Sequence, residues 1–191
     1  MTVMNTIARS GLAAARDLRA MMQGKVALLG DDAYSRARRI WNGAVGHHPA
    51  LFALCEVTED IQTAVRAARA RELPLSVRGG GHDWAGRALR PAGLVLDLSA
   101  MRRVEVDPLA RIATVSGGAT AGDVIAAAQP HGLAAVTGTV GSVGMAGLTL
   151  GGGYGGLNSR HGLALDNLLG ADIVLADGRL VIADAARNPE L

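Results

Sequence analysis

The stretch SVRGGGH at residues 76–82 decides which fold and which chemistry this chain can have. Residues 75–78 predict a short strand, and three consecutive glycines follow it. Consecutive glycine N–H groups at the end of a strand can curl into an anion-binding nest, because no side chain obstructs the approach. Arg78 would add positive charge at the edge of this nest, and His82 would lie beside the bound anion. The alternative is a glycine-rich turn with a surface histidine.

Glycine is concentrated in a few further clusters. It makes up 26 of the 191 residues, nearly twice the average share of about 7%. Eleven of the thirty-one residues from 132 to 162 are glycine. These clusters lie between aliphatic segments, so they do not form a flexible linker. Ordered glycines indicate positive φ angles or a close approach to the backbone, and we therefore expect a long ligand lying against bare backbone.

The composition excludes several classes of protein. With 49% hydrophobic and 19% charged residues, the chain can bury a core and is not disordered. Its length suits one full domain or two small domains that share a core. The net charge is only +2 and aromatic residues make up 3% of the chain, so neither a basic surface nor stacking side chains indicate a nucleic-acid partner.

The sequence carries no signal for a membrane or for secretion. No apolar run approaches about 18 residues, and charged residues such as Arg9 and Asp17 interrupt any apolar region near the N-terminus. We therefore expect no membrane association and a cytoplasmic location. The single cysteine, Cys55, excludes an internal disulfide framework and a cysteine-cluster metal site. It lies in an apolar run, which favours a buried, inert thiol, and we expect no bound metal.

The first half of the chain predicts a helical segment followed by a β-α-β unit. Residues 1–45 form the N-terminal helical segment, with helices expected at 12–22 and 32–41. Residues 46–99 form the first subdomain. Its expected elements are a strand at 50–57, a helix with Thr58 as its N-cap that ends near Arg71, and strands at 75–78 and 94–98.

The second subdomain, residues 100–191, predicts a hairpin, a helix and a second hairpin. Its helix begins at Thr120, which forms a capping-box-like pair with Asp123, and ends after Ala128. The expected hairpins cover 103–116, around Asp107-Pro108, and 171–183, around Asp177-Gly178. The glycine-rich stretch between them predicts short helical pieces at best. The fold class is α+β, with two small α/β subdomains around a glycine-lined cleft.

Other motifs point to alternatives with weaker support. The string GGGYGG at 151–156 satisfies the G-x-G-x-x-G pattern of NAD-binding Rossmann proteins, but no convincing strand precedes it. No G-K-[ST] P-loop and no G-x-S-x-G nucleophile elbow occurs. The pair His47-His48 has no carboxylate at a ligand spacing, so a solvated loop is the favoured interpretation.

Three motifs in order carry a resemblance to a known family. They are SVRGGGH at 76–82, GTVGSVGMAG at 138–147 and GGGYG at 151–155. Together they resemble the FAD-binding domain of the vanillyl-alcohol oxidase and p-cresol methylhydroxylase (PCMH-type) flavoproteins, and within them the berberine-bridge-enzyme-like oxidoreductases. The resemblance covers about residues 34–191. Several motifs at matching separations are far more specific than one glycine string.

The resemblance implies FAD as cofactor and assigns positions around it. The glycine turn cradles the pyrophosphate, and His82 matches the histidine that bonds covalently to the 8α-methyl of the isoalloxazine. Two later loops lie along the flavin and near the diphosphate, and the backbone of Val174 meets the adenine. The cofactor-binding residues expected in this sequence are Arg78, Gly79, Gly80, Gly81, His82, Gly118, Ala119, Thr139, Val143, Gly144, Gly147, Gly152, Gly153, Gly155 and Val174.

The sequence departs from the family pattern in two places. Many relatives make a second flavin bond through a cysteine, but Val140 occupies that position and Cys55 lies elsewhere. We therefore expect one covalent link, through His82. The family also continues into a substrate domain, whereas this chain stops at 188–191, directly after a hairpin. We interpret this as a truncation, so that the substrate pocket and the catalytic base lie outside the chain.

Three functional hypotheses remain. The first is the FAD-binding module of a flavin-dependent oxidoreductase, in which hydride passes from a C–H bond of a small-molecule substrate to flavin N5. The second is a flavin-binding module without turnover of its own, which needs a separate or missing C-terminal chain. The third is a Rossmann NAD protein, which the copurifying cofactor would distinguish. None of these hypotheses assigns a catalytic residue to this chain.

Overall fold

A four-stranded sheet organises the first half of the chain. In the computed structural model, which describes residues 2–191, the strands follow the order β1-β2-β4-β3. β2, β4 and β3 run parallel in register, with Leu51 opposite Leu94 and Leu94 opposite Leu75, whereas β1 pairs antiparallel with β2. The strands are β1 (Lys25–Leu28), β2 (Leu51–Leu54), β3 (Leu75–Arg78) and β4 (Leu94–Asp97).

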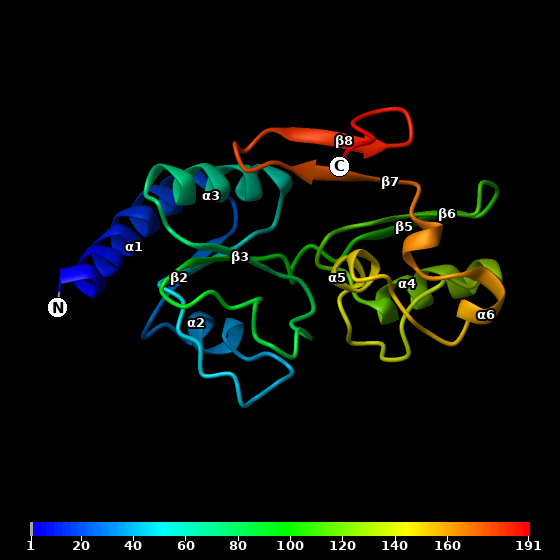
Figure 1. Cartoon of the computed structure of the whole chain (residues 1–191), viewed down its shortest axis with the longest axis horizontal. Coiled ribbons are helices and arrows are strands. Elements are labelled where there is room, and N and C mark those ends of the chain that lie inside the picture. The colour runs from blue at the N-terminus through cyan, green and yellow to red at the C-terminus, as the bar shows by residue number, and fades with distance from the viewer. Residues whose placement is uncertain (1) are drawn as a thin grey trace.

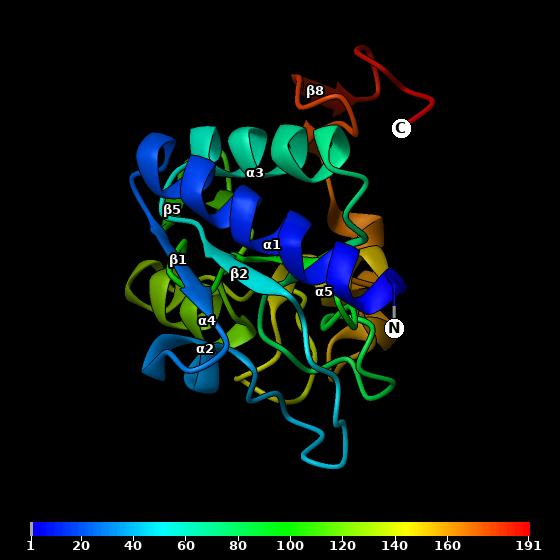
Figure 2. The ribbon, with the colours of Figure 1, turned by 90° about the vertical axis from the view of Figure 1, so that its left-hand side faces the viewer.

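Helices cover both faces of this sheet. α1 (Thr2–Met21) and α3 (Thr58–Ala70) pack on one face, and α2 (Asp32–Ala37) packs on the other (Figures 1 and 2). Successive side chains of a strand point to opposite faces of the sheet, so each central strand contributes residues to the apolar clusters on both faces. In β2, Leu51 and Ala53 enter the larger core cluster with α1 and α3, and Phe52 enters the cluster with α2.

The buried carboxylate of Asp60 joins two loops at one end of this half. Its side chain is almost inaccessible, at 1% exposure. The sequence prediction that Thr58 caps α3 is wrong: Thr58 is the first helical residue, and Asp60 satisfies the free N–H groups instead. The backbone N–H donors to Asp60 are those of Gln23, Gly24, Glu56 and Val57, at 2.8–3.3 Å.

Two elements of the first half differ from the sequence prediction. β1 was not predicted. It has only four residues, and its two buried residues are adjacent, so the sequence shows neither the apolar–polar alternation of a strand nor the periodicity of a helix. α2 was predicted to reach residue 41 but ends at Ala37, so that Trp41 lies in a loop with 68% exposure. Ile40 and Trp41 have the spacing of a helix face, and the prediction therefore extended the helix to residue 41. In the structure these two residues instead pack on the loop that follows β3.

The second half confirms the predicted hairpin, helix and hairpin. The short helical pieces expected in the glycine-rich stretch are also present, and the α+β fold class is confirmed. The chain runs through β5 (Val104–Asp107), β6 (Ile112–Val115), α4 (Ala121–Ala128), the 3-10 turn η1 (Gln129–His131), α5 (Met145–Leu150), α6 (Asn158–His161), η2 (Leu165–Asn167), β7 (Gly170–Val174) and β8 (Leu180–Asp184).

The last hairpin returns to the first half and lies beside α3 (Figure 1). At its turn, the carbonyl oxygen of Gly178 accepts hydrogen bonds from Gln62 Nε2 at 2.8 Å and Arg66 Nη1 at 3.0 Å. Val174 of β7 also packs against the larger core cluster. This hairpin therefore packs the C-terminal part of the chain against α3 of the first half. The proposed boundaries at 45/46 and 99/100 stay predictions.

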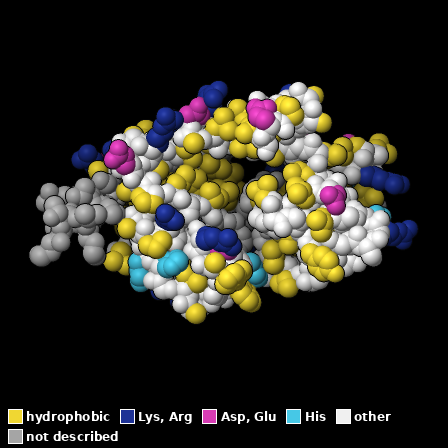
Figure 3. All heavy atoms as spheres, viewed as in Figure 1, with side chains coloured by type: hydrophobic (Ala, Val, Ile, Leu, Met, Phe, Trp, Pro, Cys, Tyr) yellow, Lys and Arg dark blue, Asp and Glu magenta, His cyan; other side chains and the backbone are white. Residues whose placement is uncertain are grey.

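The second half has little core of its own. Both clusters of buried apolar residues are built in the first half. On the hairpins, large apolar side chains such as Ile112, Leu180 and Ile182 are more than 40% exposed. Figure 3 shows apolar side chains spread over the surface of both halves.

No helix among residues 2–191 has the length and apolar character needed to cross a membrane.

Candidate cofactor site

A cleft of about 450 Å³ lies where the two halves meet. Figure 3 shows the surface hollowed between them. Most of its walls are glycine backbone and short polar side chains, as expected for a site that accepts a ligand against bare backbone. The lining residues are Arg78, Gly79, Gly80 and Ser99 from the first half and Arg102, Gly118, Thr120, Gly122, Asp123, Gly141 and Ser142 from the second.

Two glycine loops meet back to back beside this cleft. A Cβ atom on Gly144 would lie 2.5 Å from the backbone nitrogen of Gly80, and a Cβ on Gly80 would collide with Gly144 in return. Neither glycine has a positive φ angle; in this turn only Gly81 does, with φ 70°. Gly80 and Gly144 are therefore required by close approach of two backbones. Their contact brings the 79–82 turn and the 141–144 loop together.

The 79–82 turn presents unused backbone donors. Within residues 2–191, the N–H groups of Gly79, Gly80, Gly81 and His82 donate to no acceptor. The N–H groups of the facing Gly141 and Ser142 are equally free. Adjacent free N–H groups without obstructing side chains form an anion-binding concavity. This arrangement suits a phosphate or pyrophosphate.

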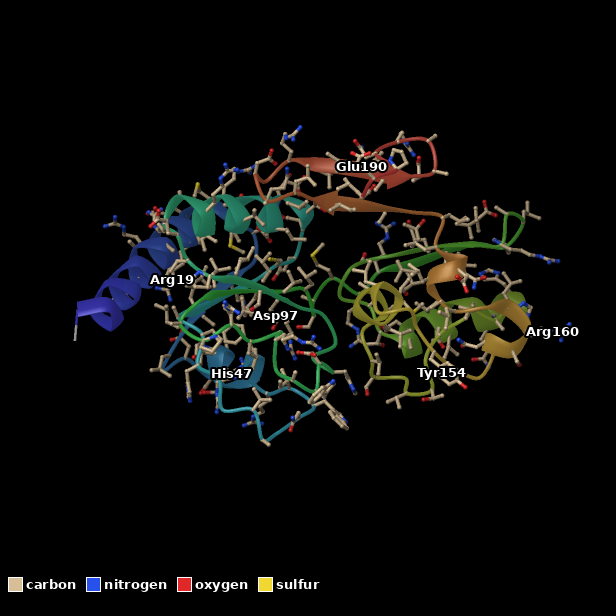
Figure 4. The ribbon with its side chains drawn as sticks, viewed as in Figure 1. Arg19, His47, Asp97, Tyr154, Arg160 and Glu190 are labelled. Carbon is tan, nitrogen blue, oxygen red and sulfur yellow. The ribbon has the colours of Figure 1, made fainter. Side chains whose placement is uncertain are left out.

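Arg78 does not add an isolated charge to this concavity. Its Nη1 donates to Asp97 Oδ2 at 2.7 Å, and both side chains are largely buried, with 14% and 3% exposure. Figure 4 labels Asp97 at the end of β4, near the junction of the halves. The pair balances its own charge, so the donors for an anion are mainly backbone N–H groups. Arg78 instead fixes the ends of β3 and β4 relative to each other.

A second ion pair lies across the cleft. Arg102 donates to Asp123 through Nε at 2.9 Å and Nη2 at 2.6 Å. Asp123 also accepts from the N–H and the hydroxyl of Thr120, which closes the predicted capping box of α4. The Arg102 hydrogen bonds, helped by those from Thr120, lower the pKa of Asp123 to about 2.

His82 is held at the side of the cleft by two contacts. Its Nε2 lies 2.9 Å from Ser142 Oγ, and its ring stacks on the indole of Trp41 with centroids 5.9 Å apart. The Trp41 loop is itself attached to this turn, since the N–H of Trp41 donates to the carbonyl oxygen of Gly81 at 3.0 Å. His82 does not line the cleft directly, but its partner Ser142 does.

The second predicted loop, around Gly118 and Ala119, packs tightly behind the cleft. A Cβ on Gly118 would collide with the carbonyl group of Leu98, and Ala119 is fully buried. The N–H of Met145 donates to the carbonyl oxygen of Ala119 at 2.8 Å, and that of Ala121 donates to Val143. This loop therefore positions the 141–145 segment. Only Gly118 of the two lines the cleft.

The remaining predicted residues lie outside the cleft lining. Gly152 and Gly153 adopt positive φ angles of 97° and 77°, and Gly155 packs against the carbonyl group of Thr137. Around Gly147 there is open space, because a Cβ there would meet no atom within 4 Å. The cleft lining contains none of these predicted positions: Thr139, Gly147, Gly152, Gly153, Gly155 and Val174.

Sequence reasoning missed several cleft residues. Ser142 and Gly141 belong to the glycine-rich motif, but nothing in that motif identifies their partners across the chain. The partner of Gly141 is Gly122, whose N–H donates to the carbonyl oxygen of Gly141 at 2.8 Å. Asp123 was identified only as a helix cap. Its spacing from Thr120 is a local signal, whereas its pairing with Arg102 is a tertiary contact.

Two residues outside the cleft have structural explanations. His47 was predicted to lie in a solvated loop, but it is half-buried, and its Nδ1 lies 3.0 Å from the carbonyl oxygen of Leu89 and 3.2 Å from that of Gly86. It therefore organises the loop after the glycine turn. Cys55 is fully buried, as predicted, and burial together with the nearby Asp60 and Asp97 raises the pKa of its thiol to about 12.

Comparison with known proteins identifies the family. Residues 49–184 match the family described as "FAD binding domain". This chain belongs to that family. Over 170 residues it is 39% identical to (R)-6-hydroxynicotine oxidase of Paenarthrobacter nicotinovorans, an alignment that covers 89% of this chain and 37% of that protein. The chain thus spans little more than a third of the length of this curated relative.

Solved structures agree with this assignment. The chain superposes on 6-hydroxy-D-nicotine oxidase from Arthrobacter nicotinovorans with a TM-score of 0.86 at 39% identity, covering 88% of this chain and 37% of the other. Xylooligosaccharide oxidase from Myceliophthora thermophila gives 0.87 at 31% identity, covering 95% and 38%. The BBE-like 1 protein of Physcomitrella patens gives 0.84 at 29% identity, with the same coverage. The predicted PCMH-type, berberine-bridge-enzyme-like FAD-binding domain is confirmed.

Proposed function

We propose that the cleft between the two halves binds FAD, with the pyrophosphate on the turn of Gly79, Gly80 and Gly81 and the flavin end toward His82. The observation that carries this placement is the row of free N–H groups at residues 79–82, which faces the free donors of the 141–142 loop. The family match supports FAD as the ligand. The donor set fits a diphosphate, since it supplies hydrogen bonds without bulky side chains.

In the complete protein we expect oxidation of a small organic substrate. FAD supplies the acceptor for a hydride from a substrate C–H bond, while the protein binds and orients the cofactor. The similar proteins include oxidases named for a hydroxynicotine and for xylooligosaccharides, so amine and sugar substrates are the classes to test. We assign no catalytic residue to this chain, and the whole activity would need groups beyond the region that it shares with its relatives.

A single covalent bond would hold the flavin, through His82. Val140 occupies the position of the second, cysteine link, so no second nucleophile is available there. In the attachment a ring nitrogen of His82 bonds to the 8α carbon and one methyl C–H bond breaks. The isoalloxazine would take up two electrons and the methyl proton, and the imidazole proton would leave to solvent. Dioxygen would then accept the two electrons with two protons, one of them from solvent, as hydrogen peroxide.

The test is acid precipitation of the FAD-loaded chain followed by peptide mass mapping. We expect yellow colour in the pellet and a flavin-modified peptide that contains His82. In His82→Ala the colour should move to the supernatant, while non-covalent FAD binding remains. Colour that stays in the His82→Ala pellet would move the link to another residue. Colour in the wild-type supernatant, with the peptide unmodified, would remove the covalent bond from the proposal.

A second candidate is a flavin-binding module without turnover of its own, completed by a separate C-terminal chain. The observation that favours it is the site itself, whose free N–H donors suit a cofactor while we assign no catalytic residue to this chain. Steady-state oxidation of hydroxynicotine and xylooligosaccharides by this chain alone separates the two candidates. Turnover by the isolated chain would contradict the second candidate, and turnover only after the remaining domain of a relative is added would support it.

A further inference from the structure

The ring of His82 is oriented by this chain's own residues before any ligand is bound. Ser142 contacts one ring nitrogen at 2.9 Å, and Trp41 covers one face of the ring with an interplanar angle of 22°. The side chain of Asn42 secures the Trp41 loop, since its Nδ2 donates to the carbonyl oxygen of Trp84 at 2.7 Å. The indole fixes the plane of the imidazole. The hydrogen bond to Ser142 involves only one of the two imidazole nitrogens, Nε2, and so makes the two nitrogens of His82 different.

The serine contact has a chemical consequence. A neutral imidazole carries its proton on one nitrogen and a lone pair on the other, and the partner of one nitrogen sets which form is present. Among residues 2–191, Nδ1 of His82 has no hydrogen-bond partner. The hydroxyl of Ser142 makes no other bond to these residues, and Ser142 is exposed, so its own hydrogen can point to water.

We propose that Ser142 is a positioning residue that accepts the Nε2 proton of His82, leaves the lone pair on Nδ1, and so directs the flavin bond to Nδ1. The inference rests on the proposed covalent link. If the hydroxyl donated to Nε2 instead, Nδ1 would carry the proton and neither nitrogen would offer a free lone pair. After the bond forms, the Nε2 proton can pass along this hydrogen bond, and the exposed hydroxyl connects it to solvent.

The tautomer can be measured without FAD. In the chain labelled with ¹⁵N-histidine, long-range ¹H–¹⁵N correlations of His82 should show a protonated Nε2 and an unprotonated Nδ1. Ser142→Ala should give a mixture of both tautomers, and Ser142→Thr, which keeps the hydroxyl, should restore the wild-type pattern. Ser159→Ala, an exposed serine on α6, is the matched control and should leave the pattern unchanged.

The attachment itself gives the second readout. Ser142→Ala should slow covalent incorporation roughly tenfold or more, since a misplaced nucleophile loses the advantage of orientation. The rate is measured at saturating FAD, so that a change in non-covalent affinity does not enter it. The wild-type flavinyl peptide should carry the flavin on Nδ1. Attachment through Nε2, a wild-type ring protonated on Nδ1, or identical tautomers and rates in Ser142→Ala would each overturn the role of Ser142. A wild-type chain that binds FAD but never attaches it would overturn the covalent link itself.

Discussion

At the scale of single residues, glycine at position 80 serves the contact between two loops. The close approach of Gly80 and Gly144 leaves no room for a methyl group between the backbones. The sequence identified both glycines as cofactor residues through the motif, but it could not show that they touch each other across more than sixty positions. The same limit concealed the partnership of Ser142 with His82. Motifs identify residue types, and tertiary packing selects their partners.

Gly80→Ala should destabilise the chain and weaken FAD binding. Overpacking of this kind costs about 1–3 kcal/mol, because one backbone must move, and the move would separate the two rows of N–H donors. Gly46→Ala is the control, since a Cβ there meets nothing within 4 Å. Urea denaturation and FAD titration of both variants provide the measurement. Unchanged FAD affinity in Gly80→Ala would separate this glycine from the binding site.

The thiol of Cys55 should be unreactive in the folded chain. It is fully buried and its pKa is about 12, so almost no thiolate is present at pH 8. An aromatic disulfide reagent should therefore react slowly with the native protein and rapidly in denaturant, which makes Cys55 a reporter of unfolding. Immediate native-state reaction at pH 8 would show that the core around β2 opens readily.

At the scale of elements, local chemistry explains what the sequence predicted. The hairpins formed around Asp107-Pro108 and Asp177-Gly178, because these residues favour turns between apolar strands. α4 formed between its capping box and Gly132, whose φ of 66° ends the turn. The unpredicted β1 forms only by pairing with β2, a tertiary effect. An analysis of hydrophobic periodicity does not detect a short strand in which buried and exposed residues do not alternate.

The cap of α4 should respond to acid through Arg102. Asp123 has its pKa lowered to about 2, so its ionised form stabilises the fold above the unfolded pKa of about 3.9, and this contribution is lost as the pH falls through 2. In Arg102→Gln, which removes the main cause, the pKa of Asp123 should rise toward its ordinary value. A ¹³C-carboxyl titration measures this shift.

The neighbouring Arg103→Gln serves as control for the α4 cap, because Arg103 pairs with Glu105 instead. Its Asp123 titration should match the wild type. An unchanged Asp123 pKa in Arg102→Gln would mean that Thr120 alone holds the carboxylate in its ionised form.

At the scale of the whole molecule, the two halves differ in how they are stabilised. The first half has a sheet covered on both faces, whereas the second half carries two separate two-stranded hairpins with exposed apolar side chains. Isolated two-stranded hairpins are marginally stable in water. The sequence predicted two α/β subdomains around a glycine-lined cleft from the order of the expected elements and the positions of the glycine clusters. The lack of a core in the second half could not be predicted, since burial depends on packing.

The 191-residue chain should therefore bind a hydrophobic dye and gain stability from FAD. A ligand that binds only the folded form adds about 2.7 kcal/mol at a hundredfold excess over its dissociation constant, and FAD would bridge the halves. Thermal unfolding with and without FAD, followed with an apolar dye, measures both effects. A sharp transition that FAD does not shift, with no dye bound beforehand, would contradict this expectation.

The central claim is that the glycine turn at 79–81 holds the pyrophosphate of FAD in the cleft. Isothermal titration of the chain with FAD and with FMN, which lacks the diphosphate and adenosine, tests it most directly. Phosphate and adenosine contacts made only by FAD should make its affinity at least roughly tenfold higher, a difference of about 1.4 kcal/mol. Equal affinities for FAD and FMN, or no binding of FAD by the folded chain, would contradict the claim.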